Sequence, residues 1–331
     1  MKAKAVVFTE KGKIDVRELT LAKLADNEVM IDVEYSAISP GTERWCLTGM
    51  FHYGKDCYYK FPLVPGYQHA GYVAAVGKDV KSLKVGDRAF ACNSRFEEVP
   101  CFNWGGHCSM SVNAEEAVIK LPDNVSFKDA AFLVVAQVGY NGGSRPSVEP
   151  GDVAVVIGDG LIGQFVAQTL RARGAYVITA GKGDLERLEY ARKYSCDMVV
   201  DTAKNDLKKE VAKISPEGVK IVVEAIGIHE NTAVAFDLLA WNGHYVLNGF
   251  YPLENRVDLN PFSTKEITIH NPAGYTRQRF LRTLEMIGRG KLNVNSLITH
   301  TIKWPDAPKA YENLLLNRKE FSMGIAIDWK D

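Results

Sequence analysis

Six residues near the middle of the chain have the types and the spacing to hold a phosphate. They read Gly158-Asp159-Gly160-Leu161-Ile162-Gly163, which is G-x-G-x-x-G, and they lie between the apolar run VAVVI and the helical pattern LIGQFVAQTLRAR. In that context the first glycine allows a tight turn, the second lets backbone N–H groups approach a pyrophosphate, and the third lets the helix pack on the strand. The N-terminus of that helix offers free N–H donors. We therefore predict a dinucleotide site at Gly158, Gly160, Leu161, Ile162 and Gly163, rather than a glycine turn that binds nothing.

The next strand predicts which dinucleotide binds. An acidic residue at its end would accept hydrogen bonds from the adenosine ribose and repel a 2′-phosphate. The segment YVITAGK instead ends in Gly181 and Lys182, and Arg187 follows one helical turn later. A glycine leaves room there and two cations suit a phosphate, so the sequence favours NADP(H) over NAD(H). The alternative is that Lys182 is only a solvated loop residue.

The elements that would position this site change character along the chain. The first third has short alternating runs (KAKAVVF, EVMIDVEYSAI, AGYVAAVG) separated by glycine turns, which predicts a barrel-like β domain. After Ser126, a predicted helix N-cap, apolar strand-like runs alternate with helical patterns. This alternation indicates βαβ units and a doubly wound parallel sheet. The fold class is therefore α/β, with two domains.

Composition excludes several classes of function. Forty basic and forty acidic residues give a formal net charge of zero, so no global field attracts nucleic acid or anionic lipid. No apolar run approaches the ~20 residues needed to span a bilayer, and the N-terminus lacks a signal-peptide pattern, so we expect a cytoplasmic protein. Cys92, Cys101 and Cys108 lie near His107 in sequence, but their spacing lacks the close pairs of a zinc site. We expect packed thiols there.

The whole chain resembles the medium-chain dehydrogenase/reductase superfamily. The resemblance lies in SAISPGTE, FPLVPGYQHAGYVAAVG, VGDRAF, GGHCSMSV, VIGDGLIGQFVAQTLRARGA, VVEAIG and GHYVLNGFY. It implies a GroES-like catalytic domain from residues 1–134 and 276–331, and a Rossmann domain from residues 135–275. Within the superfamily, ISPGTER and YKFPLVPGYQHAG look like the branch that contains bacteriochlorophyllide dehydrogenase.

The resemblance also implies the surroundings of the nicotinamide ring and an assembly. Ala225, Asn248, Gly249 and Phe250 would flank the ring, because they follow later strands of the sheet. The segment EITIH would pair with its copy across a two-fold axis, which predicts a homodimer.

The sequence departs from the superfamily at the catalytic zinc. Pro40 stands where a ligand cysteine is usual, Tyr67 where a ligand histidine is usual, and Val134 near the third ligand. None of these side chains is a good zinc ligand, so we expect a zinc-independent protein. The oxygen that gains charge in hydride transfer then needs a proton donor.

The candidates for that donor come from the same two segments. Thr42 matches the hydroxyl of the superfamily's proton relay, and Tyr67 should point at the reacting centre, with Glu43 and His69 as neighbours that tune it. The structural alternatives are that Tyr67 fills the core and that His69 is a satisfied buried histidine.

The sequence therefore predicts an oxidoreductase that transfers a hydride between NAD(P) and a secondary alcohol or ketone of polyol, sugar or hydroxyalkyl type. The alternatives are an NADPH-dependent quinone or enoyl reductase, and a non-catalytic nucleotide-binding protein.

Two further groups of side chains have a binding and a structural interpretation each. The aromatic side chains either wall a substrate pocket or pack a loop, and they are Trp45, Phe51, Tyr53, Tyr58 and Tyr59. Arg277 and Arg279 are either helix-start cations or a clamp for an anion.

Overall fold

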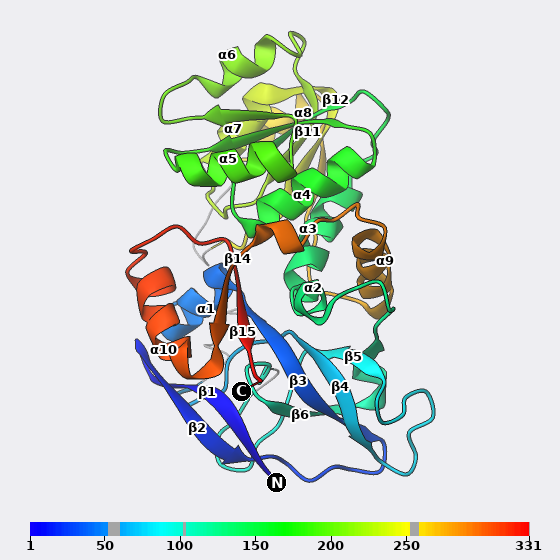
Figure 1. Cartoon of the computed structure of the whole chain (residues 1–331). Coiled ribbons are helices and arrows are strands. Elements are labelled where there is room, and N and C mark those ends of the chain that lie inside the picture. Colours follow the sequence, from blue (N-terminus) through cyan, green and yellow to red (C-terminus); the bar gives the residue numbers. More distant parts are fainter. Residues whose placement is uncertain (52–59, 102–103, 252–257, 331) are drawn as a thin grey trace. The chain divides into compact units, whose positions relative to one another are not determined.

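A computed structural model of the chain describes residues 1–51, 60–101, 104–251 and 258–330 and divides it into two units (Figure 1). The first unit comprises Met1–Val134 and Ile298–Asp331, and the second comprises Val135–Leu297. Residues 276–297, which the resemblance assigned to the first domain, therefore group with the second. One contact that joins this segment to the second unit is made by Gln168, whose side chain accepts a hydrogen bond from the N–H of Asn293 (2.7 Å) and donates one to its carbonyl (3.4 Å).

The second unit is built on a six-stranded parallel sheet with the order β10-β9-β8-β11-β12-β13. Its strands are β8 (Val153–Ile157), β9 (Tyr176–Gly181), β10 (Met198–Asp201), β11 (Val219–Glu224), β12 (Leu239–Leu247) and β13 (Thr268–His270). From β8 the chain first adds β9 and β10 on one side. It then adds β11, β12 and β13 on the other side of β8. This doubly wound order confirms the predicted fold class.

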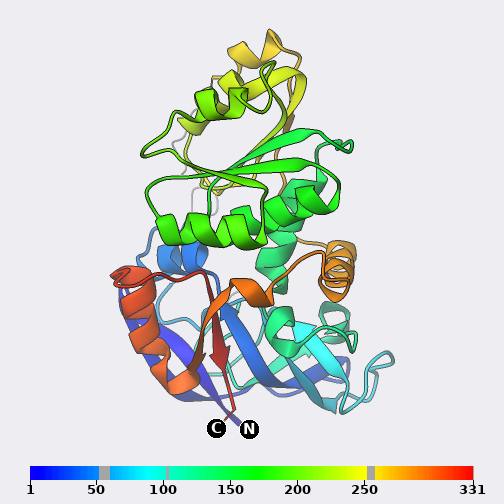
Figure 2. The ribbon, with the colours of Figure 1, turned by 45° about the horizontal axis from the view of Figure 1, so that its top comes forward.

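Helices cover both faces of this sheet, because its strands carry apolar side chains on both faces (Figures 1 and 2). The helices on the two faces are α4 (Leu161–Ala172), α5 (Leu185–Tyr194), α6 (Leu207–Ala212), α7 (Asn231–Leu238) and α8 (Asn260–Ser263). Ala154 and Val156 face α4 and α5, whereas Val155 and Ile157 face α6, α7 and α8. The structure also has α3 (Leu133–Ser144) and α9 (Arg277–Gly288).

The first unit is mainly β structure, as expected. A two-stranded antiparallel sheet joins β1 (Lys2–Glu10) and β2 (Lys13–Thr20). A seven-stranded sheet has the order β14-β15-β3-β4-β5-β7, with β6 paired to β3. Its strands are β3 (Glu28–Ile38), β4 (His69–Val76), β5 (Arg88–Ala91), β6 (Met110–Ala114), β7 (Ile119–Lys120), β14 (Ile298–Lys303) and β15 (Gly324–Asp328).

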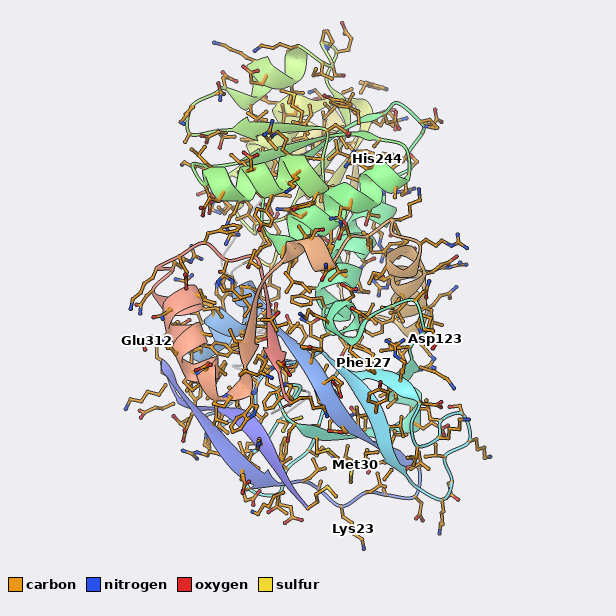
Figure 3. The ribbon with its side chains drawn as sticks, viewed as in Figure 1. Lys23, Met30, Asp123, Phe127, His244 and Glu312 are labelled. Carbon is orange, nitrogen blue, oxygen red and sulfur yellow. The ribbon has the colours of Figure 1, made fainter. Side chains whose placement is uncertain are left out.

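Short helical segments complete the first unit. They are α1 (Pro40–Leu47), α2 (Phe127–Ala130), α10 (Ala307–Ala310), a π-helical turn (Tyr311–Leu316) and two 3₁₀ turns (Glu115–Ala117, Trp304–Asp306), with a further 3₁₀ turn (Asn295–Leu297) in the second unit. Ser126 caps α2 as predicted, accepting the N–H of Asp129 (3.0 Å), but that helix stops at Ala130 and α3 begins anew at Leu133. Phe127, labelled in Figure 3, packs edge-on against Tyr72 of β4.

No helix in the described part of the chain is both long enough and apolar enough to cross a membrane.

Candidate active site

The glycine turn between β8 and α4 has the backbone geometry that phosphate binding requires. Gly158 has φ +121°, a conformation that other residues rarely adopt, and a Cβ on Gly163 would lie 2.0 Å from the carbonyl oxygen of Gly158. Gly160 is the N-cap of α4, and the N–H groups of Leu161, Ile162 and Gly163 therefore occupy the first turn of that helix, where no intrahelical acceptor exists. The N–H groups of Leu161, Ile162 and Gly163 therefore form one set of backbone donors, while Gly158 and Gly160 shape the turn that presents them.

The space beside the end of β9 is occupied, contrary to the sequence interpretation. A Cβ on Gly181 would lie 2.1 Å from Oδ2 of Asp159, so the carboxylate of Asp159 fills the position of the missing side chain. Lys182 is exposed. Arg187 forms an ion pair with Asp184 (2.9 Å), whose side chain also caps α5. The predicted opening for a 2′-phosphate therefore holds a negative charge instead.

Glu224, at the end of β11, holds the loops at the carboxyl edge of the sheet together. Its buried carboxylate accepts hydrogen bonds from the N–H groups of Ile226 (3.0 Å) and Gly227 (2.9 Å), from the Asn231 side chain (3.1 Å) and from the Tyr251 hydroxyl (2.5 Å). The sequence analysis missed Glu224, although an acidic residue at the end of the buried run KIVVE was the available signal.

The residues predicted to flank the nicotinamide lie on these loops. Ala225 donates its N–H to Ile157 (2.9 Å), and a Cβ on Gly249 would lie 2.2 Å from the nitrogen of Gly227, so only glycine fits there. The amide nitrogen of the buried Asn248 side chain has no hydrogen-bond partner among the described residues. Phe250 is 44% exposed. Their contact with the ring remains a prediction.

In the first unit, the side chains of Tyr67 and Thr42 meet. The hydroxyl of Tyr67 forms hydrogen bonds with the side chains of Ser39 and Thr42, at the start of α1. Burial raises the pKa of Tyr67 well above its usual value of 10. This phenol is therefore protonated at neutral pH and can donate a proton.

Glu43 is the centre of a second, fully buried network. Its carboxylate accepts hydrogen bonds from the N–H of Ser39 (2.8 Å), from Nε2 of His107 (2.9 Å) and from the hydroxyl of Tyr311. On the other side of the imidazole, Nδ1 of His107 bonds the Ser36 hydroxyl (2.8 Å). Ser39 joins both networks, because its N–H serves Glu43 while its side chain serves Tyr67.

Sequence reasoning missed His107, Tyr311 and Ser36 as members of this network. One local signal exists: Gly66 has φ +81°, and a Cβ there would lie 2.6 Å from the His107 ring. Nothing in the local sequence pairs Tyr311 with Glu43, which lies 268 residues earlier.

His69 lies outside both networks. Its Nε2 bonds the Ser111 hydroxyl (2.7 Å), and burial together with the nearby His107 lowers its pKa to about 3. It is a neutral, buried histidine of the β-sheet, which agrees with the structural alternative. Gln68 also supports the fold, since its side chain donates to the Ala37 carbonyl (3.2 Å) and accepts the N–H of Val134 (3.0 Å).

Within the part of the chain that the structure describes, the side chains at the superfamily's ligand positions do not fit a catalytic zinc. Pro40, Tyr67 and Val134 offer no imidazole, thiolate or carboxylate. Glu43 and His107, which are good donors, already bind each other. Across the described residues, no cluster of three or more His, Cys, Asp or Glu side chains is suited to a metal ion. The cysteines near His107 are buried, and burial raises the pKa of Cys101 to about 12.

The remaining candidates have structural contacts. Phe51 and Tyr67 both pack against Trp104 (5.9 and 5.4 Å between ring centroids), and Trp45 packs on the same core. Tyr53, Tyr58 and Tyr59 lie outside the described residues. Arg279 donates to the Ala273 carbonyl (3.3 Å).

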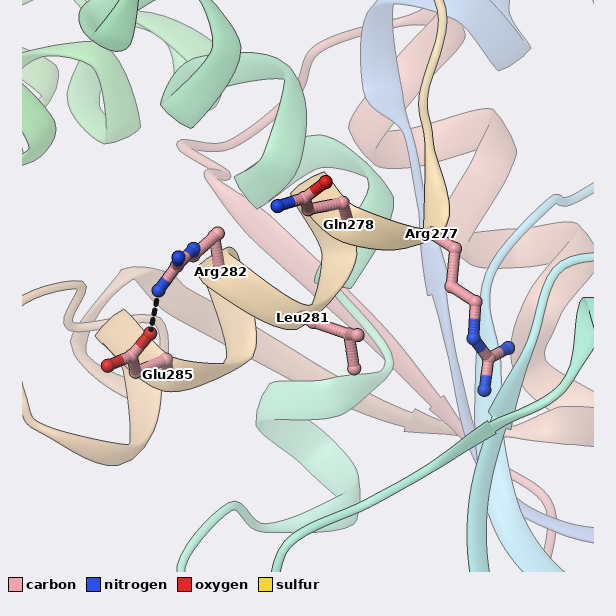
Figure 4. A pocket seen from close by; sticks show the side chains of 5 residues that line it. All are labelled: Arg277, Gln278, Leu281, Arg282 and Glu285. Atoms are coloured by element: carbon pink, nitrogen blue, oxygen red, sulfur yellow. Dashed lines mark hydrogen bonds and ion pairs between the residues drawn. The ribbon is translucent and has the colours of Figure 1, made fainter. Parts of the chain in front are cut away.

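A shallow hollow is lined only by side chains of α9 and by none of the candidates from the glycine turn (Figure 4). Its residues are Arg277, Gln278, Leu281, Arg282 and Glu285.

Comparison with known proteins supports this architecture. Residues 25–123 match the alcohol dehydrogenase GroES-like domain, and residues 162–289 match the zinc-binding dehydrogenase family. The chain is 30% identical over 280 residues to L-idonate 5-dehydrogenase of Vitis vinifera, covering 76% of each protein. It is 29% identical to D-xylulose reductase of Morganella morganii, covering 93% of this chain and 96% of that protein.

Solved structures share the fold over essentially the whole chain. An oxidoreductase/dehydrogenase of unknown specificity from Escherichia coli superposes with a TM-score of 0.88 at 24% identity, covering 100% of both chains. A putative zinc-binding dehydrogenase from Sinorhizobium meliloti, bound to NADP, superposes with a TM-score of 0.86 at 19% identity, covering 99% of this chain and 100% of that one. The chain thus belongs to the medium-chain dehydrogenase/reductase superfamily, among its alcohol dehydrogenase-like enzymes.

Proposed function

We propose that this enzyme transfers a hydride between a nicotinamide dinucleotide and the secondary alcohol or ketone carbon of a polyol or sugar-type substrate, without zinc. The glycine turn supports the dinucleotide, and the two similar proteins named for xylulose and idonate chemistry support the substrate class. One observation carries the proposal: the protonated phenol of Tyr67 stands where the superfamily usually has a metal ligand, and it is hydrogen-bonded to the hydroxyl groups of Ser39 and Thr42.

The chemistry divides between the two units. The nicotinamide, when bound, supplies or accepts the hydride. Backbone N–H groups of the glycine turn hold its pyrophosphate, and Glu224 fixes the loops that would contact the ring. In ketone reduction the Tyr67 hydroxyl donates its proton to the carbonyl oxygen. The phenolate regains a proton from solvent through the Thr42 hydroxyl, which accepts one proton as it passes another on. Alcohol oxidation runs the same transfers in reverse.

Glu43 acts indirectly in this scheme. Its carboxylate fixes the N–H of Ser39, and the Ser39 side chain in turn orients the Tyr67 hydroxyl. It is therefore a positioning residue, and His69 takes no part in the proton transfer.

The sequence favoured NADP(H) because the strand end lacks an acidic residue, because glycine leaves space there, and because Lys182 and Arg187 are cations. The carboxylate of Asp159 occupies that space and Arg187 pairs with Asp184, so the proposed function does not include a preference for NADP(H).

The proposal is tested with the purified full chain. The substrate-dependent change in absorbance at 340 nm is measured for ketoses with NADH and NADPH, and for polyols with NAD and NADP. Enones and quinones are tested as alternative substrates with NADH and NADPH. Turnover of a ketose or polyol supports the proposal. Turnover of enones or quinones alone would replace it by the reductase alternative, and dinucleotide binding without any turnover would indicate a non-catalytic protein.

A further inference from the structure

The end of β9 carries a carboxylate that does not come from β9. Gly181 is the last residue of that strand, and the atoms nearest to a Cβ built on it are Oδ2 and Cγ of Asp159, at 2.1 and 2.7 Å. The glycine turn lies beside the strand end because Gly158 donates its N–H to the Ala180 carbonyl (2.8 Å). The side chain of Asp159 therefore stands where a side chain at position 181 would project.

This carboxylate has unused capacity to accept hydrogen bonds. Its Oδ2 is shielded from solvent and has no hydrogen-bond partner among the described residues. Burial raises the pKa of Asp159, and Asp184 and Asp201 raise it further, while the nearby Arg187 lowers it. A buried acceptor without a partner is costly, so a hydroxyl donor from a ligand would stabilise it.

Of the two cations expected to bind a 2′-phosphate, Arg187 pairs with Asp184 at 2.9 Å, and Lys182 is exposed. Next to Lys182, the carboxylate of Asp201 accepts the N–H of Gly183 (2.9 Å). Three carboxylates, those of Asp159, Asp184 and Asp201, thus surround the end of β9 and would oppose a second phosphate.

We propose that Asp159 selects the cofactor: its carboxylate accepts hydrogen bonds from the adenosine ribose hydroxyls and repels a 2′-phosphate, so the enzyme prefers NAD(H). The residue comes from the glycine turn and takes the place of an acidic residue on the second strand. This inference rests on the proposed use of a nicotinamide dinucleotide.

The test is calorimetric titration of the full chain with NADH and with NADPH. We expect the wild type to bind NADH at least about tenfold more tightly, the scale of one hydrogen bond to a charged group. Asp159→Ala should weaken NADH binding about tenfold. Asp159→Asn, which keeps the shape but removes the charge, should strengthen NADPH binding about tenfold.

A matched variant serves as the control. Asp237→Asn removes the same charge from an exposed site that is paired with Lys208. It should leave the NADH to NADPH ratio within about twofold of wild type. Circular dichroism spectra and melting temperatures establish that each variant is folded.

Each outcome has a distinct meaning. Equal or tighter binding of NADPH by the wild type, or a ratio that Asp159→Ala and Asp159→Asn both leave unchanged in folded protein, overturns this inference while the proposed function stands. Failure of the wild type to bind either dinucleotide contradicts the proposed function itself.

Discussion

At Tyr67, one phenol hydroxyl meets the side chains of Ser39 and Thr42. Both threonine and tyrosine could be identified from the sequence, because they stand at positions that the superfamily uses for chemistry. The supporting groups could not. His107 and Tyr311 reach Glu43 only through the folding of strands and helices that are far apart along the chain.

Replacing Tyr67 by phenylalanine removes only the hydroxyl. If that hydroxyl is the proton donor, Tyr67→Phe lowers kcat about 100-fold with a smaller change in KM, because general acid catalysis contributes on that scale. Steady-state kinetics with the substrate found in the 340 nm assay measures this. Tyr72→Phe, the same change on an exposed side chain of β4, should leave kcat unchanged. A Tyr67→Phe enzyme with wild-type kcat would remove tyrosine from the mechanism.

The buried His69 predicts a loss of stability in acid. Its pKa is about 3 in the folded state and near 6.5 when unfolded, so between these values the unfolded chain binds the extra proton. The free energy of unfolding is therefore unaffected by the titration of His69 above pH 6.5. It decreases as pH falls toward 3, by up to about 1.4 kcal/mol per pH unit.

Urea unfolding followed by tryptophan fluorescence at pH 7.5, 6.0 and 5.0 measures this dependence. His69→Gln should show a flatter decline than wild type over that range, because glutamine does not titrate. His229→Gln, a change at an exposed histidine, should decline as wild type does. Parallel curves for wild type and His69→Gln would contradict the assignment.

At the scale of elements, the turn between β8 and α4 could be predicted because each of its requirements is local. A buried strand, three glycines and an amphipathic helix follow one another directly in the sequence. The surroundings of Gly181 could not be predicted in the same way, since the space beside it is open only if neighbouring segments leave it open. Asp159 comes from the turn after the adjacent strand β8, and no spacing rule indicates where its side chain turns.

Two glycines of this turn should respond differently to alanine. Gly163→Ala places a Cβ 2.0 Å from a backbone oxygen, so we expect a melting temperature lower by about 5 °C. At Gly160, φ is −73° and the nearest atom is Nη1 of Arg187 at 3.6 Å, so Gly160→Ala should melt within about 1 °C of wild type. It should nonetheless weaken NADH binding about tenfold, because the methyl group stands where the pyrophosphate approaches.

Scanning calorimetry and NADH titration of both variants provide the measurements. A Gly160→Ala protein that binds NADH as wild type does would show that the pyrophosphate does not approach this residue.

At the scale of the whole molecule, the fold class could be predicted, because alternating patterns and a superfamily resemblance cover the entire chain. The second domain boundary was predicted at residue 275 and lies after Leu297. The amide of Gln168 joins the segment after α9 to α4, and such a pair of hydrogen bonds leaves no pattern in the sequence.

The strand β13 supports our proposal that the enzyme is a homodimer. It lies at the end of the described sheet and pairs with β12 on one side, so its other edge can accept a copy of itself. Light scattering after gel filtration should give about twice the 36.7 kDa chain mass. Thr268→Lys, a change at an exposed residue of β13, should shift the protein toward the single-chain mass. A wild-type protein of single-chain mass at micromolar concentration would refute the dimer.

The proposed mechanism depends most on proton transfer by side chains without a metal. The most direct test is to measure turnover and zinc content on one sample, before and after dialysis against a strong chelator. We predict unchanged kcat in protein whose zinc content is far below equimolar. Activity that disappears with the zinc and returns when zinc is added back would contradict the account.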